Sequence, residues 1–210
     1  MFDKKFKNIY RIRSARLFGW DYSASAYYFI TICTKDKEHY FGKIKHGMMC
    51  LYKTGSIAWQ YWQEIPQHFH HVYIDAFVVM PNHIHGIIRI DHGGALRFGT
   101  CLECQEWYRE RRKKRITVAD WNIDLHTQDE TGHCPVSTVS VTVGDVVGSY
   151  KSIVTKSINK MFVEHNISQK FVWQERFYDS IARNEFGLDR IREYIWNNPI
   201  KWSQDRNNIF

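Results

Sequence analysis

Two histidines separated by one residue, His83 and His85, form the most suggestive chemical pattern in the sequence. They open a run of β-forming residues that follows Pro81-Asn82 and extends to Ile90. Because side chains alternate between the two faces of a strand, both imidazoles point to the same face. Two converging imidazoles are a candidate metal site, since neutral imidazole is a common metal ligand. The alternative is a histidine pair with a purely structural role.

A second pattern lies in a helix expected from about Glu185 to Asn198. Tyr194 and Asn198 are four residues apart and therefore share one face of this helix. Pro199 is expected to end the helix, because the residue before a proline avoids the α region. The side-chain oxygen of Asn198 is then a suitable ligand for a hard cation. The alternative for Tyr194 is a core residue of an amphipathic helix.

Two imidazoles and one amide oxygen would suit Mg²⁺ or Mn²⁺, and the imidazoles shift the preference towards Mn²⁺. Such a cation has room left for phosphate oxygens and can polarise a phosphate. A tyrosine beside it is a suitable nucleophile for a phosphodiester, and the aryl phosphate ester so formed keeps the bond energy for rejoining. The two patterns together therefore predict phosphoryl-transfer chemistry.

The elements that must position these residues indicate one α+β domain. Runs rich in β-formers predict strands, and apolar residues at i, i+3, i+4 and i+7 predict helices. Asp145 is expected to cap the second helix and Asn184 the third. The expected strands are 26–34, 40–45, 48–52, 72–80, 83–90 and a segment within 171–181, and the expected helices are 54–68, 145–164 and 185–198.

The same patterns divide the chain into three parts. Residues 1–22 are expected to form a basic arm, and residues 23–205 a single domain. An irregular insertion at 91–144 interrupts this domain, because no period of 2 or 3.6 is sustained there. Cys101, Cys104, His126, His133 and Cys134 of the insertion are an alternative zinc site, although the second half lacks a regular zinc-finger spacing.

Charge and composition favour a polyanionic partner and a cytoplasmic, nucleoid-associated protein. The net charge is +7, and the alternative is a protein with a solvated basic tail. Lys151, near the start of its helix, is the lysine expected to contact phosphate. No apolar run approaches the ~20 residues that span a bilayer, residues 1–16 lack the core of a secretory signal, and the five cysteines fit a reducing compartment.

Three ordered motifs resemble those of the single-tyrosine transposases, over residues 25–90 and 145–202. The segment Met80 to His85 resembles their His-hydrophobic-His (HUH) motif. The segment Tyr194 to Pro199 resembles their Tyr-Ile-x-x-Asn-Pro motif, and Trp173-Gln174-Glu175-Arg176-Phe177 resembles the Trp-Gln-x-Arg-Phe segment between them. The similarity is to REP-associated tyrosine transposases and their insertion-sequence relatives. The insertion-sequence branch typically has Gln where this chain has Asn198, which places the chain nearer the REP-associated branch.

The resemblance implies a ferredoxin-like α+β fold, an antiparallel sheet with helices packed on one face. It implies cleavage of single-stranded DNA near a hairpin, at a repeat or transposon end, through a 5′-phosphotyrosine and a free 3′-OH. It also allows a homodimer that exchanges the tyrosine helix. By position, the divalent metal ligands would be His83, His85 and Asn198, the nucleophile Tyr194, and the residues shaping the DNA site Trp173, Gln174 and Arg176.

Two other classes of protein stay open at this stage. One is a catalytically idle, sequence-specific DNA-binding protein derived from such a transposase. The other is a zinc-stabilised nucleic-acid module built on the cysteines and histidines of the insertion. The long insertion itself departs from the compact pattern of the transposase family.

Overall fold

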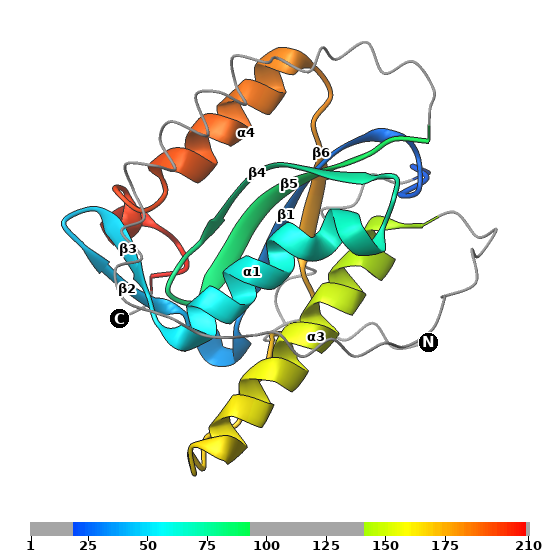
Figure 1. The fold of residues 1–210 in the computed structure, drawn as a ribbon. Helices are drawn as coiled ribbons and strands as arrows, with labels where there is room; N and C mark the ends of the chain where they lie inside the picture. The colour runs from blue at the N-terminus through cyan, green and yellow to red at the C-terminus, as the bar shows by residue number, and fades with distance from the viewer. Residues whose placement is uncertain (1–18, 93–140, 209–210) are drawn as a thin grey trace, which may run out of the picture. The chain divides into compact units, whose positions relative to one another are not determined.

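A four-stranded antiparallel sheet carries the histidine pair in the computed structural model (Figure 1). The structure describes residues 19–92 and 141–208. Both central strands are almost entirely buried. In spatial order the strands are β4 (Val72–Val79), β5 (His83–Ile90), β1 (Ala26–Cys33) and β6 (Tyr178–Ile181).

Helices cover both faces of this sheet. Helices α1 (Lys53–His68) and α3 (Val143–Glu164) pack side by side on one face, while α4 (Glu185–Asn197) lies on the other, over β4 and β5 (Figure 1). The predicted α+β class and antiparallel sheet are confirmed. The prediction of helices on one face holds for α1 and α3, whereas α4 lies on the face that carries the histidines.

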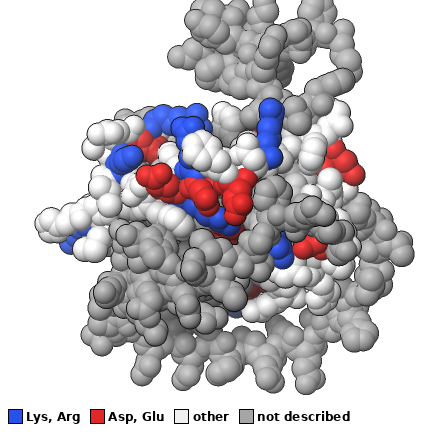
Figure 2. Space-filling model, turned by 90° about the horizontal axis from the view of Figure 1, so that it is seen from above, with Lys and Arg blue, Asp and Glu red and all other residues white. Residues whose placement is uncertain are grey.

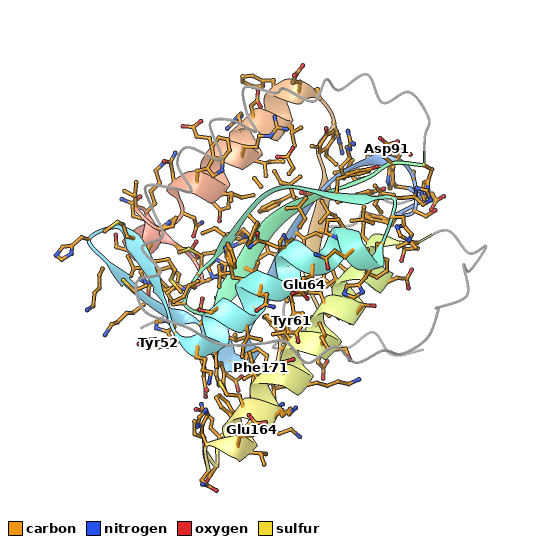
Figure 3. All side chains as sticks on the ribbon, viewed as in Figure 1. Tyr52, Tyr61, Glu64, Asp91, Glu164 and Phe171 are labelled. Atoms are coloured by element: carbon orange, nitrogen blue, oxygen red, sulfur yellow. The ribbon has the colours of Figure 1, made fainter. Side chains whose placement is uncertain are left out.

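Gly86 allows α1 to approach β5 closely. A Cβ atom at this position would lie 2.2 Å from the ring of Trp62, which is 1% exposed. Trp62 packs edge-on to Tyr150 of α3. Tyr61 of α1, labelled in Figure 3, accepts a hydrogen bond from the hydroxyl of Ser157 of α3. The apolar residues buried on this side of α1 are Ala58, Trp62 and Ile65.

The helix ends follow from local hydrogen bonds. Thr142 caps α3, because its hydroxyl oxygen accepts a hydrogen bond from the backbone N–H of Asp145. The Asp145 carboxylate accepts one from the backbone N–H of Thr142, so the two residues form a capping box. The prediction of Asp145 as the cap is therefore wrong, because the helix begins earlier, at the buried Val143. The prediction of Asn184 is confirmed, since its side chain accepts a bond from the backbone of Gly187.

A small hairpin and two short 3-10 helices complete the described chain. The hairpin pairs β2 (Gly42–Lys45) with β3 (Met48–Leu51), as expected. The 3-10 helices are η1 (Lys35–Lys37) and η2 (Trp202–Gln204), and η2 follows α4. Phe41 and Phe171 pack at 5.7 Å between ring centroids and link the start of this hairpin to the segment before β6.

Some expectations lie outside the described residues. These are most of the basic arm and of the insertion, with the cysteines and histidines considered for zinc. Among the helices of residues 19–92 and 141–208, none is long and apolar enough to cross a membrane. Seen from above, the described surface carries basic and acidic side chains next to one another rather than one uniform basic patch (Figure 2).

Candidate functional site

The two histidines converge on one point below α4. Both are buried, and their Nε2 atoms lie 3.0 Å apart. Two ligand atoms that bind one metal ion at right angles, each at ~2.1 Å, lie ~3.0 Å from one another. The spacing of the imidazoles therefore fits two adjacent positions around a shared cation.

Asn82 fixes the tautomer of His83. Both amide hydrogens of Asn82 are used, because Nδ2 donates to the backbone oxygens of Lys37 at 2.9 Å and Asn207 at 2.8 Å. Its Oδ1 is left to accept from Nδ1 of His83 at 2.8 Å. The proton of a neutral His83 is then on Nδ1, and the lone pair of Nε2 is free for a metal.

Thr31 has the same relation to His85. Its hydroxyl lies 2.8 Å from Nδ1 of His85, across the pairing of β1 with β5. A hydroxyl that accepts this proton leaves Nε2 of His85 as a ligand atom. The lone pairs on the two Nε2 atoms face one another at 3.0 Å and repel. A cation bound by both nitrogens would remove this repulsion.

Burial keeps both rings neutral. Desolvation, followed by the charge of Lys37, lowers the pKa of His83 to about 3. Desolvation also lowers the pKa of His85 well below its usual value, and the neighbouring His83 adds to the shift. Neutral imidazole is the form that binds metals, so the rings are ready to act as ligands at neutral pH.

Asp205 is a member of the site that sequence reasoning missed. Its Oδ2 lies 3.9 Å from Nε2 of His83, and one ligand atom from each of His83, His85 and Asp205 lies within 4.8 Å of the others. The Asp205 side chain is 3% exposed. Asp205 follows η2, in a segment without hydrophobic periodicity. The one sequence feature that could have indicated it is its position as an acidic residue shortly after Asn198-Pro199.

Asn198 offers a buried oxygen without a partner. Its Nδ2 donates to Oδ2 of Asp205 at 3.1 Å, whereas its Oδ1 is buried and accepts no hydrogen bond. A buried polar atom left unpaired costs about 1–3 kcal/mol, and a bound cation would remove that cost. The described residues thus offer two nitrogen donors and one carboxylate oxygen within 4.8 Å of one another, and Asn198 adds a buried side-chain oxygen that is free to bind a cation.

The conformation of Asn198 differs from the prediction. It keeps α-helical angles, with φ −57° and ψ −44°, although proline follows it. The expected reason for the end of the helix is therefore wrong. The backbone of Lys201 donates to the oxygen of Asn197 at 3.0 Å, so the chain completes one further turn across Pro199. This turn holds Asn198 on the face of α4 that carries Tyr194.

Tyr194 reaches the histidines from α4. Its hydroxyl lies 3.1 Å from Nε2 of His85, and its ring contacts Phe29 edge-on at 6.0 Å. Burial, followed by the charge of Asp205, raises the pKa of the phenol. The side chain is still 43% exposed, so another molecule can reach it. At neutral pH this tyrosine is protonated, so it would have to lose its proton before it could act as a nucleophile.

An ion pair fastens α4 to the sheet. Arg192 makes two hydrogen bonds to the carboxylate of Asp75, one of them 2.7 Å from Nε to Oδ1, and its Nη1 donates to Asp189 at 2.8 Å. Asp75 lies where the register of β4 shifts between Ile74 and Phe77. Arg192 is two residues before Tyr194 in α4, so the ion pair holds the part of the helix from which Tyr194 contacts His85.

The residues predicted to contact DNA have different surroundings. Nζ of Lys151 donates to the backbone oxygens of Gln174 at 2.7 Å and Glu175 at 3.1 Å, and burial lowers its pKa. Trp173 is 6% exposed, and its Nε1 donates to the oxygen of Lys151 at 3.2 Å. Lys151 and Trp173 thus hold the segment before β6 on α3, whereas Gln174 and Arg176 are exposed.

The fold and the site together define an α+β protein with two histidines, an aspartate, an asparagine and a tyrosine gathered on one sheet face. The fold is similar to that of a solved REP-associated tyrosine transposase bound to a REP hairpin, with a TM-score of 0.50 over 91% of this chain and 76% of that chain. At 14% sequence identity, the likeness concerns the fold alone.

The sequence comparisons give the family. No family model matches the sequence. The chain is 36% identical over 198 residues to an uncharacterized protein of Haemophilus influenzae, which covers 94% of this chain and 93% of that protein. The chain therefore belongs to the same protein family as this Haemophilus influenzae protein.

Proposed function

We propose that this protein is a metal-dependent transposase that cleaves and rejoins single-stranded DNA near hairpins through a 5′-phosphotyrosine. One observation carries the proposal: the Tyr194 hydroxyl lies 3.1 Å from Nε2 of His85, which itself lies 3.0 Å from Nε2 of His83. A partly exposed tyrosine, which would be the nucleophile, thus lies next to two buried histidines, which would be the metal ligands.

The chain's own residues supply most of the reaction. His83, His85, Asp205 and Asn198 would hold Mg²⁺ or Mn²⁺, which polarises the scissile phosphate and stabilises its developing charge. The Tyr194 hydroxyl gives its proton to water, and its oxygen forms a bond to phosphorus while the bond from phosphorus to the 3′ oxygen breaks. The 3′ oxygen takes up a proton. Because one phosphate ester replaces another, the reverse attack by the 3′-OH rejoins the strand.

Three further observations support a DNA substrate. The structural neighbour holds a REP hairpin, the net charge of this chain is +7, and its motifs resemble those of enzymes that act on single strands. We propose a hairpin at a repeat or transposon end as the partner. Since Tyr194 contacts a histidine of its own chain, a homodimer is not required to complete the site.

The test is a covalent adduct. The protein is incubated with hairpin-bearing single-stranded DNA and Mn²⁺ or Mg²⁺, and a DNA-protein band is sought on a denaturing gel. We expect an adduct that chelation of the metal prevents and that Tyr194→Phe abolishes. Tyr52→Phe is the matched control, because Tyr52 is equally exposed, 46% against 43%, and precedes α1.

Each other outcome contradicts a defined part of the proposal. An adduct that survives Tyr194→Phe contradicts the choice of nucleophile. An adduct that forms in the absence of any divalent cation contradicts the role of the histidines. Binding of the hairpin without an adduct under any of these metals contradicts the enzyme and favours the idle DNA-binding protein.

A further inference from the structure

Four residues form a row across the histidine face of the sheet. His85 of β5 pairs with Val78 of β4 on one side and with Thr31 of β1 on the other, and Thr31 pairs with Tyr178 of β6. Directly paired residues of antiparallel strands point to the same face. Tyr178 is therefore on the face of the histidines, two strands away from His85, at about 10 Å.

Tyr178 is placed unlike the core tyrosines. It is 42% exposed on a short edge strand, whereas Tyr28 and Tyr150 are 0% and 2% exposed. The guanidinium of Arg206 lies over its ring, 5.7 Å from the centroid. An exposed aromatic ring that is not needed for the core, combined with an arginine, is the arrangement on which single-stranded nucleic acids stack their bases.

Arg206 also belongs to the surroundings of the candidate metal centre. It directly follows Asp205, and its backbone oxygen accepts a hydrogen bond from Nζ of Lys37 at 3.0 Å. Asp205 lies within 4.8 Å of the two histidines by its ligand atom, so the neighbouring Arg206 belongs to the same part of the molecule. Its positive charge complements the charge of a DNA strand.

We propose that Tyr178 and Arg206 form a clamp that stacks the base of one unpaired nucleotide next to the scissile phosphate. This inference rests on the proposed function and adds a contact to the substrate strand. The ring supplies the stacking surface, and the guanidinium binds the neighbouring phosphate or the edge of the base. Because every base has a flat face, the clamp positions the strand and does not read its sequence.

The chain contains a matched pair for comparison. Tyr73 of β4 is 45% exposed, and the guanidinium of Arg89 lies 4.5 Å from the centroid of its ring. Tyr73 pairs with Arg89 four residues along β5 from His85, towards the other end of the strand. A substitution of Tyr73 removes the same chemistry from a different place on the sheet.

The test combines variants of the protein with single abasic positions in the hairpin substrate. Binding of the hairpin is measured by fluorescence anisotropy with protein that carries Tyr194→Phe. The KM is measured by adduct formation with protein that keeps Tyr194. We expect one abasic position beside the cleavage site to weaken binding by about 5- to 150-fold. Tyr178→Ala should cause a similar loss with intact DNA, and the abasic position should then cause no further loss.

The controls separate the clamp from a general loss of structure. Tyr178→Phe keeps the ring and should restore the abasic penalty, and Tyr73→Ala should leave it unchanged. A full abasic penalty in Tyr178→Ala overturns the clamp, as does a loss in Tyr73→Ala equal to that in Tyr178→Ala. Since binding is measured with Tyr194→Phe, these results do not depend on cleavage. Absence of an adduct with the Tyr194 enzyme would instead count against the proposed function.

Discussion

Each histidine of the candidate metal centre is oriented by one neighbouring acceptor. Asn82 receives the Nδ1 proton of His83, and the Thr31 hydroxyl lies 2.8 Å from Nδ1 of His85. Groups in this second layer fix the ring orientation and raise the basicity of the ligand nitrogen. They can be altered while the ligand itself stays in place, which makes them sensitive probes of whether a metal is bound.

Thr31→Val should weaken Mn²⁺ binding by about 10- to 100-fold, because it keeps the shape of the side chain and removes the hydroxyl that faces His85. Isothermal titration calorimetry with Mn²⁺ measures the change. Thr155→Val is the control, since the Thr155 hydroxyl donates to the backbone of Lys151 within α3. Equal Mn²⁺ affinity in Thr31→Val and the unchanged protein would show that His85 is not a ligand.

The site could be predicted from the sequence only where its residues share one element. His83 with His85 and Tyr194 with Asn198 follow from the periods of a strand and a helix. Their roles stay predictions, although the structure brings the four residues together. Asp205 could not be found in this way, because its approach to His83 depends on the turn across Pro199 and on η2, and neither has a periodic signal.

At the scale of elements, the position of α4 decides whether Tyr194 can act. The Arg192–Asp75 pair is mostly buried, with 13% and 14% of the two side chains exposed. It connects the middle of α4 to the irregular part of β4. We regard Arg192 as a positioning residue, since it acts on the tyrosine through the helix.

Arg192→Ala should slow adduct formation in single-turnover experiments while leaving Mn²⁺ affinity nearly unchanged, because two of the proposed metal ligands are on β5. Loss of a partly screened pair should lower the free energy of unfolding by about 1–3 kcal/mol. Faster amide hydrogen exchange confined to α4 would identify the cause. Arg190→Ala, an exposed arginine of the same helix, should leave the rate unchanged. If both variants react at the normal rate, the ion pair does not position the tyrosine.

Gly86→Ala should destabilise the protein by about 1–3 kcal/mol, because the new methyl group overlaps the ring of Trp62 behind the histidine strand. Gly148→Ala, on the exposed side of α3, has no atom within 4 Å of its Cβ and should instead stabilise the protein by about 0.4–1 kcal/mol. Urea denaturation measures both changes. An effect of the same sign in the two variants would contradict this packing.

The helices and strands were predicted from local sequence patterns, but the face of the sheet on which each helix packs was not. Periodicity gave α1, α3 and α4, and β-forming runs gave the central strands, all within a few residues. The stripe of Leu188 and Ile195 shows that α4 buries one side, but it does not show against which face of the sheet. Both faces of the central strands are apolar enough to receive a helix, so the sequence could not decide between them.

At the scale of the whole molecule, the buried histidines link stability to pH. The pKa of His83 is about 3 in the folded chain, against 6.5 for an exposed histidine, and burial is the main cause. The unfolded chain therefore takes up a proton first as the pH falls. The stability from this group is complete above pH 6.5 and is lost as the pH falls from 6.5 towards 3.

For each of His83 and His85, metal-free protein should lose up to about 1.4 kcal/mol of unfolding free energy per pH unit as the pH falls below 6.5. Urea denaturation between pH 7 and pH 4 measures this slope. Replacing both His83 and His85 by Asn should flatten it, and His70→Gln, at an exposed position, should not. A slope that is unchanged in the double variant would show that other groups cause the acid sensitivity.

The Tyr194–His85 contact joins residues that are 109 positions apart in the chain. A ribosome that adds about 5–20 residues per second leaves on the order of 5–20 seconds between the synthesis of the two halves. A nascent chain can form the histidine strand during this interval, but it lacks Tyr194. Under the proposed function, any product of premature termination within the interval would be unable to form the phosphotyrosine link to DNA. Chain order would then restrict strand breakage to proteins whose translation has passed α4.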